Sequence, residues 1–402
     1  MAERLPPSTL IKQIASQAAI RAALDWVHRA QDLLADETVR VTEIPAPTFA
    51  EGKRAAYVAE RFARLGLEQV ELAADGNVYG LLQGEQTADT APAALYAHLD
   101  TVFGPDVPVN VTRNNGRLHA PGVGDNSAGV AGVLAALEAM QHADARPAGP
   151  VWIVATVGEE GLGDLCGARA ATERLAGQLA AVVAIEGSFF GRVSHTAVGS
   201  RRWRITTSAG GGHSWHDFGK SSAVHALVRA AAAISALDVP REPRTTFNIG
   251  EISGGTGVNV IAESARMLLD MRSIDAAELD QLAARVQRIL DGVKSADVTV
   301  SLEEVGNRPA GNVAVTHPLV QTCAAILDRL GVTPVYAAAS TDANVPLSHG
   351  IPAVTLGVTR GGGAHTRGEW VEIAPMVRGV QQIVLLLGAL GRMDAVAAAA
   401  FT

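Results

Sequence analysis

Two adjacent glutamates directly follow a strongly apolar stretch near the middle of the chain. Residues 151–157 read Val-Trp-Ile-Val-Ala-Thr-Val, and Gly158-Glu159-Glu160-Gly161 comes next. The apolar run predicts a strand buried on both faces of a parallel sheet, and such strands present ligand-handling groups at their carboxyl ends. Adjacent side chains at a strand end point in roughly opposite directions. One glutamate could bind a metal ion while the other transfers protons, although the pair alone is equally consistent with two surface acids.

Other metal-binding side chains occur at similar places, each at the end of a predicted strand or in the loop beyond it. Together with Glu160 they are His98, Asp125, Glu186 and His365. Histidines and carboxylates without cysteine suit zinc, and less often cobalt or manganese. Five ligands are too many for one catalytic ion with an open position, so we expect two divalent ions that share one carboxylate. Asp100 lies two residues after His98, where it can accept the imidazole N–H and fix the tautomer.

The elements that must position these residues alternate between apolar strands and helices. This alternation predicts an α/β fold, a three-layer catalytic domain with a mostly parallel central sheet. Strands are expected at 70–72, 78–82, 94–98, 151–157, 181–185, 332–336 and 352–356. Helices are expected at 8–39, 51–65, 128–140, 168–175, 317–329 and 376–390, with Asn126 or Ser127 as the cap of helix 128–140.

The order of elements changes between about residues 196 and 307. Strands are expected there at 201–207, 245–252, 265–273 and 298–305, with helices at 222–237 and 277–293. The order strand, helix, strand, strand, helix, strand is typical of a ferredoxin-like α+β domain. We therefore expect a discontinuous catalytic domain, 1–195 and 308–402, with an inserted lid and dimerisation domain at 196–307.

Composition excludes several classes of function. The chain has 402 residues, 48% of them hydrophobic and 18% charged, with a net charge of -8, which suits a folded enzyme larger than one typical domain. No block of basic residues occurs, so nucleic acid and anionic membranes are not expected partners. Two cysteines cannot build a disulfide framework. This count and the lack of a signal-peptide pattern predict a cytoplasmic protein without membrane spans.

At this point the chain resembles the M20 zinc metallopeptidases, a family that includes peptidase T-like tripeptidases, carboxypeptidases, aminoacylases, and deacylases of acetylornithine and succinyl-diaminopimelate. The resemblance covers nearly the whole chain. The matching motifs are His98-Leu99-Asp100, Gly124-Asp125-Asn126, Glu159-Glu160-Gly161, Glu186 and Ala364-His365.

The resemblance implies a role for each of these motifs. One metal would take His98, Asp125 and Glu186, and the other would take Asp125, Glu160 and His365. Glu159 would be the general base that takes a proton from the attacking water and returns it to the leaving amine. The peptide bond after Asp125 is typically cis in this family.

Residues of the inserted domain match the family as well. Gly212-His213-Ser214 resembles the lid histidine that reaches across a homodimer interface into the partner's active site, where it would hold the oxyanion. Asn259, within Gly257-Val-Asn-Val-Ile261, resembles the family's Asn-Val-Ile motif. Arg272 lies 13 residues after Asn259, as does the family's substrate-binding arginine, so the two side chains are expected to grip the substrate's carboxylate end.

The substrate stays open between two classes, a small peptide and an N-acyl amino acid. Glu186 and Arg272 favour a substrate with a free carboxylate near the scissile amide, and residues 158–164 resemble peptidase T. Backbone N–H groups around Gly362 are expected to add a small anion site. A serine hydrolase and a dinucleotide-binding protein are excluded because residues 122–129 fit neither spacing. A binding protein that has lost the chemistry is the remaining alternative.

Overall fold

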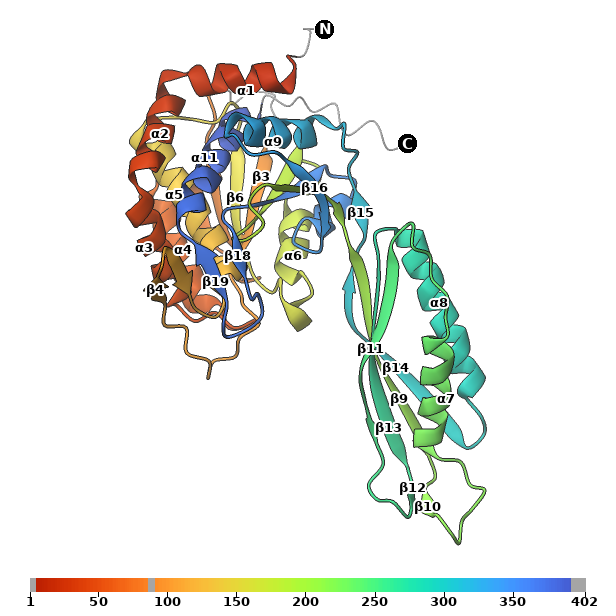
Figure 1. Ribbon diagram of the computed structural model, residues 1–402. Coiled ribbons are helices and arrows are strands. Elements are labelled where there is room, and N and C mark those ends of the chain that lie inside the picture. The colour runs from red at the N-terminus through yellow and green to blue at the C-terminus, as the bar shows by residue number, and fades with distance from the viewer. Residues whose placement is uncertain (1–4, 86–90, 392–402) are drawn as a thin grey trace. The chain divides into compact units, whose positions relative to one another are not determined.

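The computed structural model describes residues 5–85 and 91–391. The chain divides into two compact units (Figure 1). Unit 1 comprises Met1–Ala197 and Asn312–Thr402, and unit 2 comprises Val198–Gly311. The expected boundaries, at 195/196 and 307/308, lie within a few residues of these limits.

Unit 1 is built on a sheet that has nine strands within the described residues, in the order β1-β2-β6-β3-β7-β17-β8-β15, with β16 paired to β8. Its centre is parallel, namely β6 (Val151–Thr156), β3 (Ala93–His98), β7 (Ala181–Glu186) and β17 (Ala353–Gly357). The other strands are β1 (Glu68–Leu72), β2 (Val78–Leu82), β8 (Arg192–Ala197), β15 (Gly311–Asn312) and β16 (Val335–Ala339). Every residue of β3, β7 and β17 is buried, as expected for a central parallel sheet. The predicted α/β fold with a mostly parallel sheet is confirmed.

Helices lie on both faces of this sheet (Figure 1). They are α1 (Pro7–Ser16), α2 (Ala18–Arg29), α3 (Gln31–Thr42), α4 (Gly52–Arg64), α5 (Ala128–His142), α6 (Cys166–Arg174), α9 (Pro318–Arg329), α10 (Asn344–Ser348) and α11 (Ala374–Ala389). The prediction of one helix over 8–39 is wrong, because the chain breaks at Gln17 and Ala30. Neither break has a glycine or proline, so packing against other helices, α1 on α9 and α3 on α5, decides their positions. The proposed side-chain cap of α5 is also wrong, since Ser127 makes no such bond.

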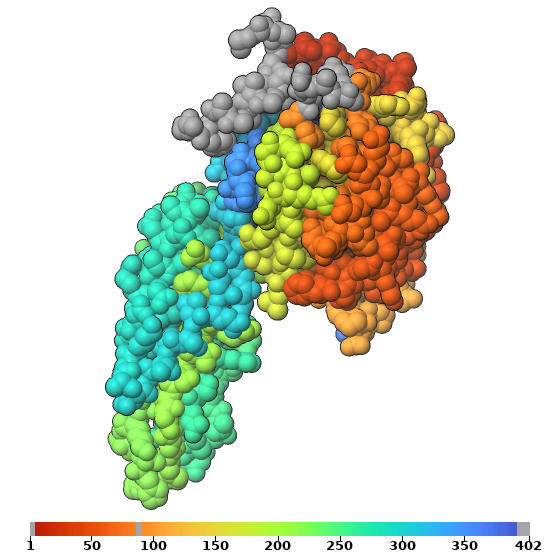
Figure 2. All heavy atoms as spheres, turned by 180° about the vertical axis from the view of Figure 1, so that it is seen from behind, coloured from red at the N-terminus to blue at the C-terminus, as the bar shows by residue number. Residues whose placement is uncertain are grey.

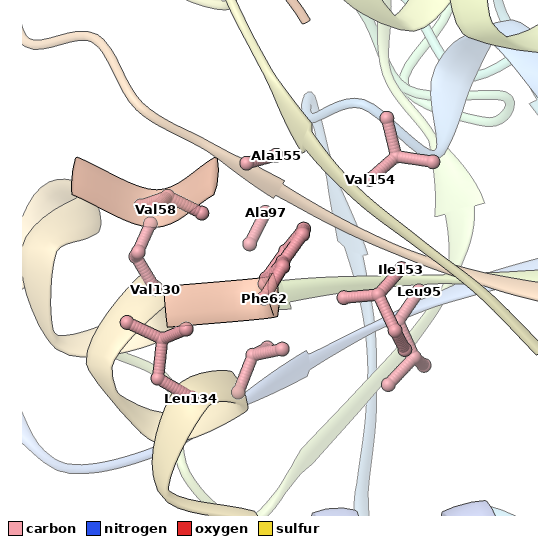
Figure 3. Close-up of a pocket in the computed structure, with 10 residues that line it drawn as sticks. Val58, Phe62, Leu95, Ala97, Val130, Leu134, Ile153, Val154 and Ala155 are labelled. Carbon is pink, nitrogen blue, oxygen red and sulfur yellow. The ribbon is translucent and has the colours of Figure 1, made fainter. Parts of the chain in front are cut away.

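The core of unit 1 between α4, α5, β3 and β6 is closely packed. A small cavity of about 10 Å³ lies there, lined only by apolar side chains (Figure 3). A void without polar groups offers nothing to orient a substrate, so it is a packing defect. Seen from behind, the segment from α4 to β2 forms much of the surface of unit 1 (orange in Figure 2).

Unit 2 is an antiparallel four-stranded sheet in the order β11-β13-β9-β14. Its strands are β9 (Gly199–Ala209), β11 (Thr245–Gly254), β13 (Ser264–Ser273) and β14 (Val298–Arg308), and its helices are α7 (Ala223–Ser235) and α8 (Ala276–Val293). Both helices pack on the sheet around a core of their own. Within the described ranges, no helix of either unit has the length and apolarity needed to cross a bilayer.

A second, small sheet of unit 1 joins segments far apart in the sequence. Its order is β18-β19-β5-β4, with bounds β4 (Thr112–Asn114), β5 (Arg117–His119), β18 (Gly361–Gly362) and β19 (Trp370–Glu372). Strands of two or three residues have no readable alternation, so the sequence did not predict them. The sheet places the segment after His365 beside the segment before Asp125.

Candidate metal centre

The carboxyl ends of the central parallel strands place the candidate ligands together. His98 ends β3 in register with Thr156 of β6, and Glu186 ends β7 in register with Gly357 of β17. Parallel strands end at the same edge of a sheet. Glu159 and Glu160 therefore emerge beside His98, although more than fifty residues separate them in sequence.

Asp125 lies between two groups of donor atoms. Its Oδ1 is 3.0 Å from Nε2 of His98, which is itself 3.6 Å from Oε2 of Glu186. Its Oδ2 is 3.1 Å from Nε2 of His365, and that nitrogen is 3.1 Å from Oε1 of Glu160. All five side chains singled out in the sequence thus converge, and one carboxylate faces both groups.

The donor atoms fit divalent cations. Donor atoms of His98, Asp125 and Glu160 all lie within 4.8 Å of one another. Around an ion bound at about 2.0–2.1 Å with tetrahedral angles, neighbouring donors are about 3.3 Å apart, close to the separations observed here. Carboxylates outnumber imidazoles in this buried place, and a buried excess of negative charge calls for a cation.

Mutual contacts shift the pKa values of the cluster when no metal is bound. Burial opposes the protonation of His98, but Glu186, Asp100 and Asp125 outweigh it and raise the pKa of His98 well above its usual value. Hydrogen bonds with Asp125 and Glu160 raise the pKa of His365 to about 10. Burial raises the pKa of Glu186 to about 7, against the effect of His98. The metal-free cluster therefore holds protons that bound cations would displace.

These shifts predict how the stability of the metal-free protein depends on pH. His365 stabilises the fold fully below its unfolded pKa of about 6.5, and this contribution is lost as the pH rises towards about 10. Glu186 ionises near 4.5 when unfolded but near 7 when folded, so its ionisation also lowers stability as the pH rises. The melting temperature of chelator-treated protein should fall between about pH 6 and pH 9.

The metal-loaded protein provides the control for this measurement. Its stabilisation over the metal-free form should grow with pH, because fewer protons then compete for the ligands. Melting curves with and without chelator, recorded in matched buffers, measure both trends. A metal-free melting temperature that rises over this range contradicts the assignment of raised histidine and Glu186 pKa values.

The loop that carries Asp125 is held at several points. The peptide bond between Asp125 and Asn126 is cis, as the family resemblance implies. Nδ2 of Asn126 donates to the main-chain oxygen of Ile185 at 2.8 Å. Gly122 has a φ of 72°, a left-handed conformation that glycine adopts without strain. The buried carboxylate of Glu369 accepts bonds from this loop.

Asp100 has a different principal partner from the one expected. The atom nearest Nδ1 of His98 is the main-chain oxygen of Asp100 at 3.1 Å, while Oδ1 lies 3.4 Å away. The two carboxylate oxygens instead accept the main-chain N–H groups of Glu159 and Glu160, both at 2.9 Å. Asp100 therefore orients the two-glutamate loop as well as the histidine.

Three residues that were not identified from the sequence also hold Asp100 and the two-glutamate loop in place. Thr48 donates from Oγ1 to Oδ2 of Asp100 at 3.0 Å, and Oε1 of Glu51 accepts the N–H of Gly158 at 3.1 Å. The fully buried Arg54 donates to the main-chain oxygen of Leu99 at 2.7 Å. Burial lowers the pKa of Arg54 to about 10, so it stays charged at neutral pH. In the sequence these residues read only as a loop and a helix start.

His213 has a defined tautomer in unit 2. It ends β10 (Gly212–His213), which pairs with β12 (Val260–Ile261). Its Nδ1 accepts the N–H groups of Trp215 and His216 at 3.2 and 3.4 Å. In the neutral ring the proton then lies on Nε2, and the exposed side chain presents a hydrogen-bond donor.

Asn259 and Arg272 lie at opposite ends of the same sheet. Asn259 belongs to the loop between β11 and β13, where its main-chain oxygen accepts the N–H of Ser214 at 2.9 Å. Arg272 is eight residues beyond Ser264, the first residue of β13, and a strand rises about 3.3 Å per residue. About 25 Å therefore separates the two ends of β13, and Figure 1 shows β12 near one end of this sheet. The two side chains of one protomer therefore cannot both reach one small carboxylate.

Arg272 and the backbone near Gly362, which were expected to bind a substrate anion, both make contacts within their own sheets. Nε of Arg272 donates to Oδ2 of Asp270 at 2.7 Å, which holds the guanidinium on the face of the sheet opposite α7 and α8. Gly362 pairs with Trp370 in the small sheet. Backbone groups near Gly362 are thus part of a strand ladder, which leaves fewer N–H groups for an anion than a free glycine loop would.

Comparison with known proteins places these features in a family. Residues 94–389 match the profile described as peptidase family M20/M25/M40. Protein YqjE of Bacillus subtilis (strain 168) is 24% identical over 379 residues, which cover 88% of this chain and 97% of that protein. A succinyl-diaminopimelate desuccinylase of Paraburkholderia xenovorans (strain LB400) is 28% identical over 251 residues, covering 58% and 66% of the two chains.

The fold is shared with solved structures. A tripeptidase from Staphylococcus aureus subsp. aureus Mu50 superposes with a TM-score of 0.76 at 22% identity, over 90% of this chain and 99% of that one. The predicted resemblance and the prediction of an enzyme that hydrolyses C–N bonds are confirmed by the family match. The profile covers the chain from β3 to the last residue of α11 and includes all five candidate ligands, so the chain belongs to peptidase family M20/M25/M40.

Proposed function

We propose that the protein is a dinuclear metallohydrolase that cleaves an amide bond in a small peptide with a free carboxylate. The observation that carries the proposal is the position of Asp125 between two groups of donor atoms, beside the buried glutamate pair. A histidine and a carboxylate complete each group. Zinc suits this nitrogen and oxygen donor set best, and cobalt or manganese are alternatives.

Each group of donors would hold one ion. His98, Asp125 and Glu186 would hold the first, and Asp125, Glu160 and His365 the second. When bound, such ions polarise the scissile carbonyl and lower the pKa of water towards neutrality. Glu159 would accept the proton of the attacking water on its carboxylate and pass it to the leaving amine. Asp100 supports this role, since it binds the main-chain N–H groups of both glutamates.

Two protomers would contribute to each substrate site. Nε2–H of His213 suits the stabilisation of a developing oxyanion. Asn259 lies at the same end of unit 2 as His213, whereas Arg272 lies at the other end. One small substrate can contact both ends only if they come from different protomers, which supports a homodimer formed through unit 2. Arg272 would then bind the substrate carboxylate from one protomer and Asn259 from its partner.

Two substrate classes remain, and each has support. The peptidase family match and the fold shared with a tripeptidase support a di- or tripeptidase or a carboxypeptidase-type exopeptidase. The desuccinylase relative supports an N-acyl-amino-acid deacylase as the alternative. Both cysteines are free, which supports a reducing, cytoplasmic location.

A substrate panel tests the proposal. Protein loaded with zinc, cobalt or manganese is incubated with dipeptides, tripeptides, and N-acetyl and N-succinyl amino acids, and released amine is measured. We expect hydrolysis of peptides with a free terminal carboxylate and its loss when that carboxylate is amidated. Turnover of acylated amino acids alone would favour the deacylase. Two bound ions without hydrolysis of any member would favour a binding protein.

A further inference from the structure

A buried carboxylate outside the ligand set contacts the loop that carries Asp125. The side chain of Glu369 is buried. Its Oε1 accepts the main-chain N–H groups of Gly124 and Asp125 at 2.9 and 2.8 Å, and its Oε2 accepts that of Gly122 at 2.8 Å. Three converging N–H groups form a backbone anion site, and here a side chain of the same chain fills it.

The main chain of Glu369 ties the same two segments together. Its main-chain oxygen accepts the N–H of Ala120 at 3.1 Å, and its own N–H donates to Thr366 at 3.2 Å. The next residue, Trp370, begins β19 and pairs with His119 of β5. Glu369 thus joins the segment that starts at His365 to the loop that ends at Asp125.

The fit around this carboxylate is close. A Cβ added at Gly124 would lie 2.8 Å from Oε1 of Glu369 and 3.0 Å from Cγ1 of Val371. Real Cβ atoms essentially never come within 3.0 Å of a neighbour, so a side chain at Gly124 would displace the carboxylate of Glu369. The loop and Glu369 therefore constrain each other's positions.

The contacts of Glu369 distinguish it from the catalytic residues. Both of its oxygens are occupied by main-chain donors, and one of these donors belongs to Asp125 itself. His365, by contrast, is exposed, lies on a loop with a φ of 63°, and reaches Asp125 through a single 3.1 Å contact. The distance between the side chains of Asp125 and His365 therefore depends on the contacts between the loop that ends at Asp125 and the segment that starts at His365.

We propose that Glu369 is a positioning residue that fixes Asp125 relative to His365 and thereby determines whether the ion shared by Asp125, Glu160 and His365 binds. The inference rests on the proposed dinuclear function. The group of His98, Asp125 and Glu186 is less dependent on Glu369, because His98 and Glu186 end buried strands that pair directly in the central sheet.

Glu369→Gln tests this assignment. Glutamine keeps the shape but replaces one acceptor oxygen with a donor amide, which faces a main-chain N–H and cannot accept its bond. Loss of a residue that orients metal ligands typically weakens binding 10–100-fold. Titration of metal-free protein with zinc should give two tight equivalents for wild type and one for Glu369→Gln, with the second weakened at least about tenfold.

Two further variants complete the experiment. Glu372→Gln changes the same strand at a carboxylate that pairs with Arg117, so it should bind two ions as wild type does. Gly124→Ala perturbs the contact from the loop side and should weaken the second equivalent as Glu369→Gln does. It keeps the test available if Glu369→Gln does not fold, which far-ultraviolet circular dichroism of the metal-free protein checks.

The titration separates failure of this inference from failure of the proposed function. If both Glu369→Gln and Gly124→Ala bind two ions with wild-type affinity, the positioning role is overturned. If wild-type protein binds fewer than two ions, the dinuclear function fails instead. Two ions in wild type, one in both variants and two in Glu372→Gln support the role, whichever substrate the panel identifies.

Discussion

Replacement of Glu159 with alanine is expected to lower kcat by a factor on the order of 10²–10⁴ while both ions stay bound. This is the usual contribution of a positioned acid–base group. In our assignment Glu159 transfers protons and is not a ligand, and the loop that carries it is held by Asp100 and Glu51 through main-chain N–H groups. The substitution changes neither of these contacts. Metal analysis and steady-state kinetics on the same sample measure the two effects.

The neighbouring glutamate provides the matched control. Glu160→Ala removes a carboxylate of equal charge from the adjacent position, where Oε1 contacts His365. It should lose one ion together with activity. A Glu159→Ala protein that loses metal and activity together, beside a Glu160→Ala protein that keeps its metal, would show that base and ligand are interchanged.

Mixing two inactive variants is expected to restore activity. His213→Ala leaves Glu159 intact, and Glu159→Ala leaves His213 intact. If His213 serves the partner's site, each mixed dimer contains one site with both residues. Random exchange of equal amounts makes half of the dimers mixed, so about a quarter of wild-type activity should return.

Co-expression of the two variants with different affinity tags removes the need for subunit exchange. Doubly tagged dimers are purified and assayed for hydrolysis, and they should show about half of wild-type activity because one of their two sites is complete. A dimer of His213→Ala with the double variant His213→Ala, Glu159→Ala serves as the control and should stay inactive. Doubly tagged mixed dimers that remain as inactive as each parent would refute the action of His213 across the interface.

Much of the ligand set could be predicted because three of its residues lie at or just beyond the ends of apolar runs that indicate buried strands. The runs at 94–98, 151–157 and 181–185 are almost entirely apolar, which identifies buried parallel strands. Such strands end at one edge of the sheet, so polar residues that follow them meet there. His98, Glu160 and Glu186 were found by this reasoning. Asp125 and His365 lie on loops, and the family resemblance gave them their roles.

Glu51 and Glu369, which hold the ligand loops, could not be predicted for a physical reason, and Asp100 was predicted only as a partner of His98. All three accept hydrogen bonds from main-chain N–H groups. Every residue except proline has a main-chain N–H group, so the residue type does not reveal which N–H group a carboxylate will bind. Asn259 and Arg272 show a related limit, since their spacing in sequence did not reveal that a whole strand separates them.

The order of strands in unit 1 has a consequence for synthesis of the chain. Strand β17, which fills the sheet between β7 and β8, is made only after the whole of unit 2. Until it emerges from the ribosome, β7 is an open edge whose residues are apolar except for Glu186, and such edges pair with other chains. We therefore expect that a nascent chain needs protection of this edge until β17 (Ala353–Gly357) has been made. His365 follows β17 in sequence, so hydrolytic capacity appears at about the time when this edge closes.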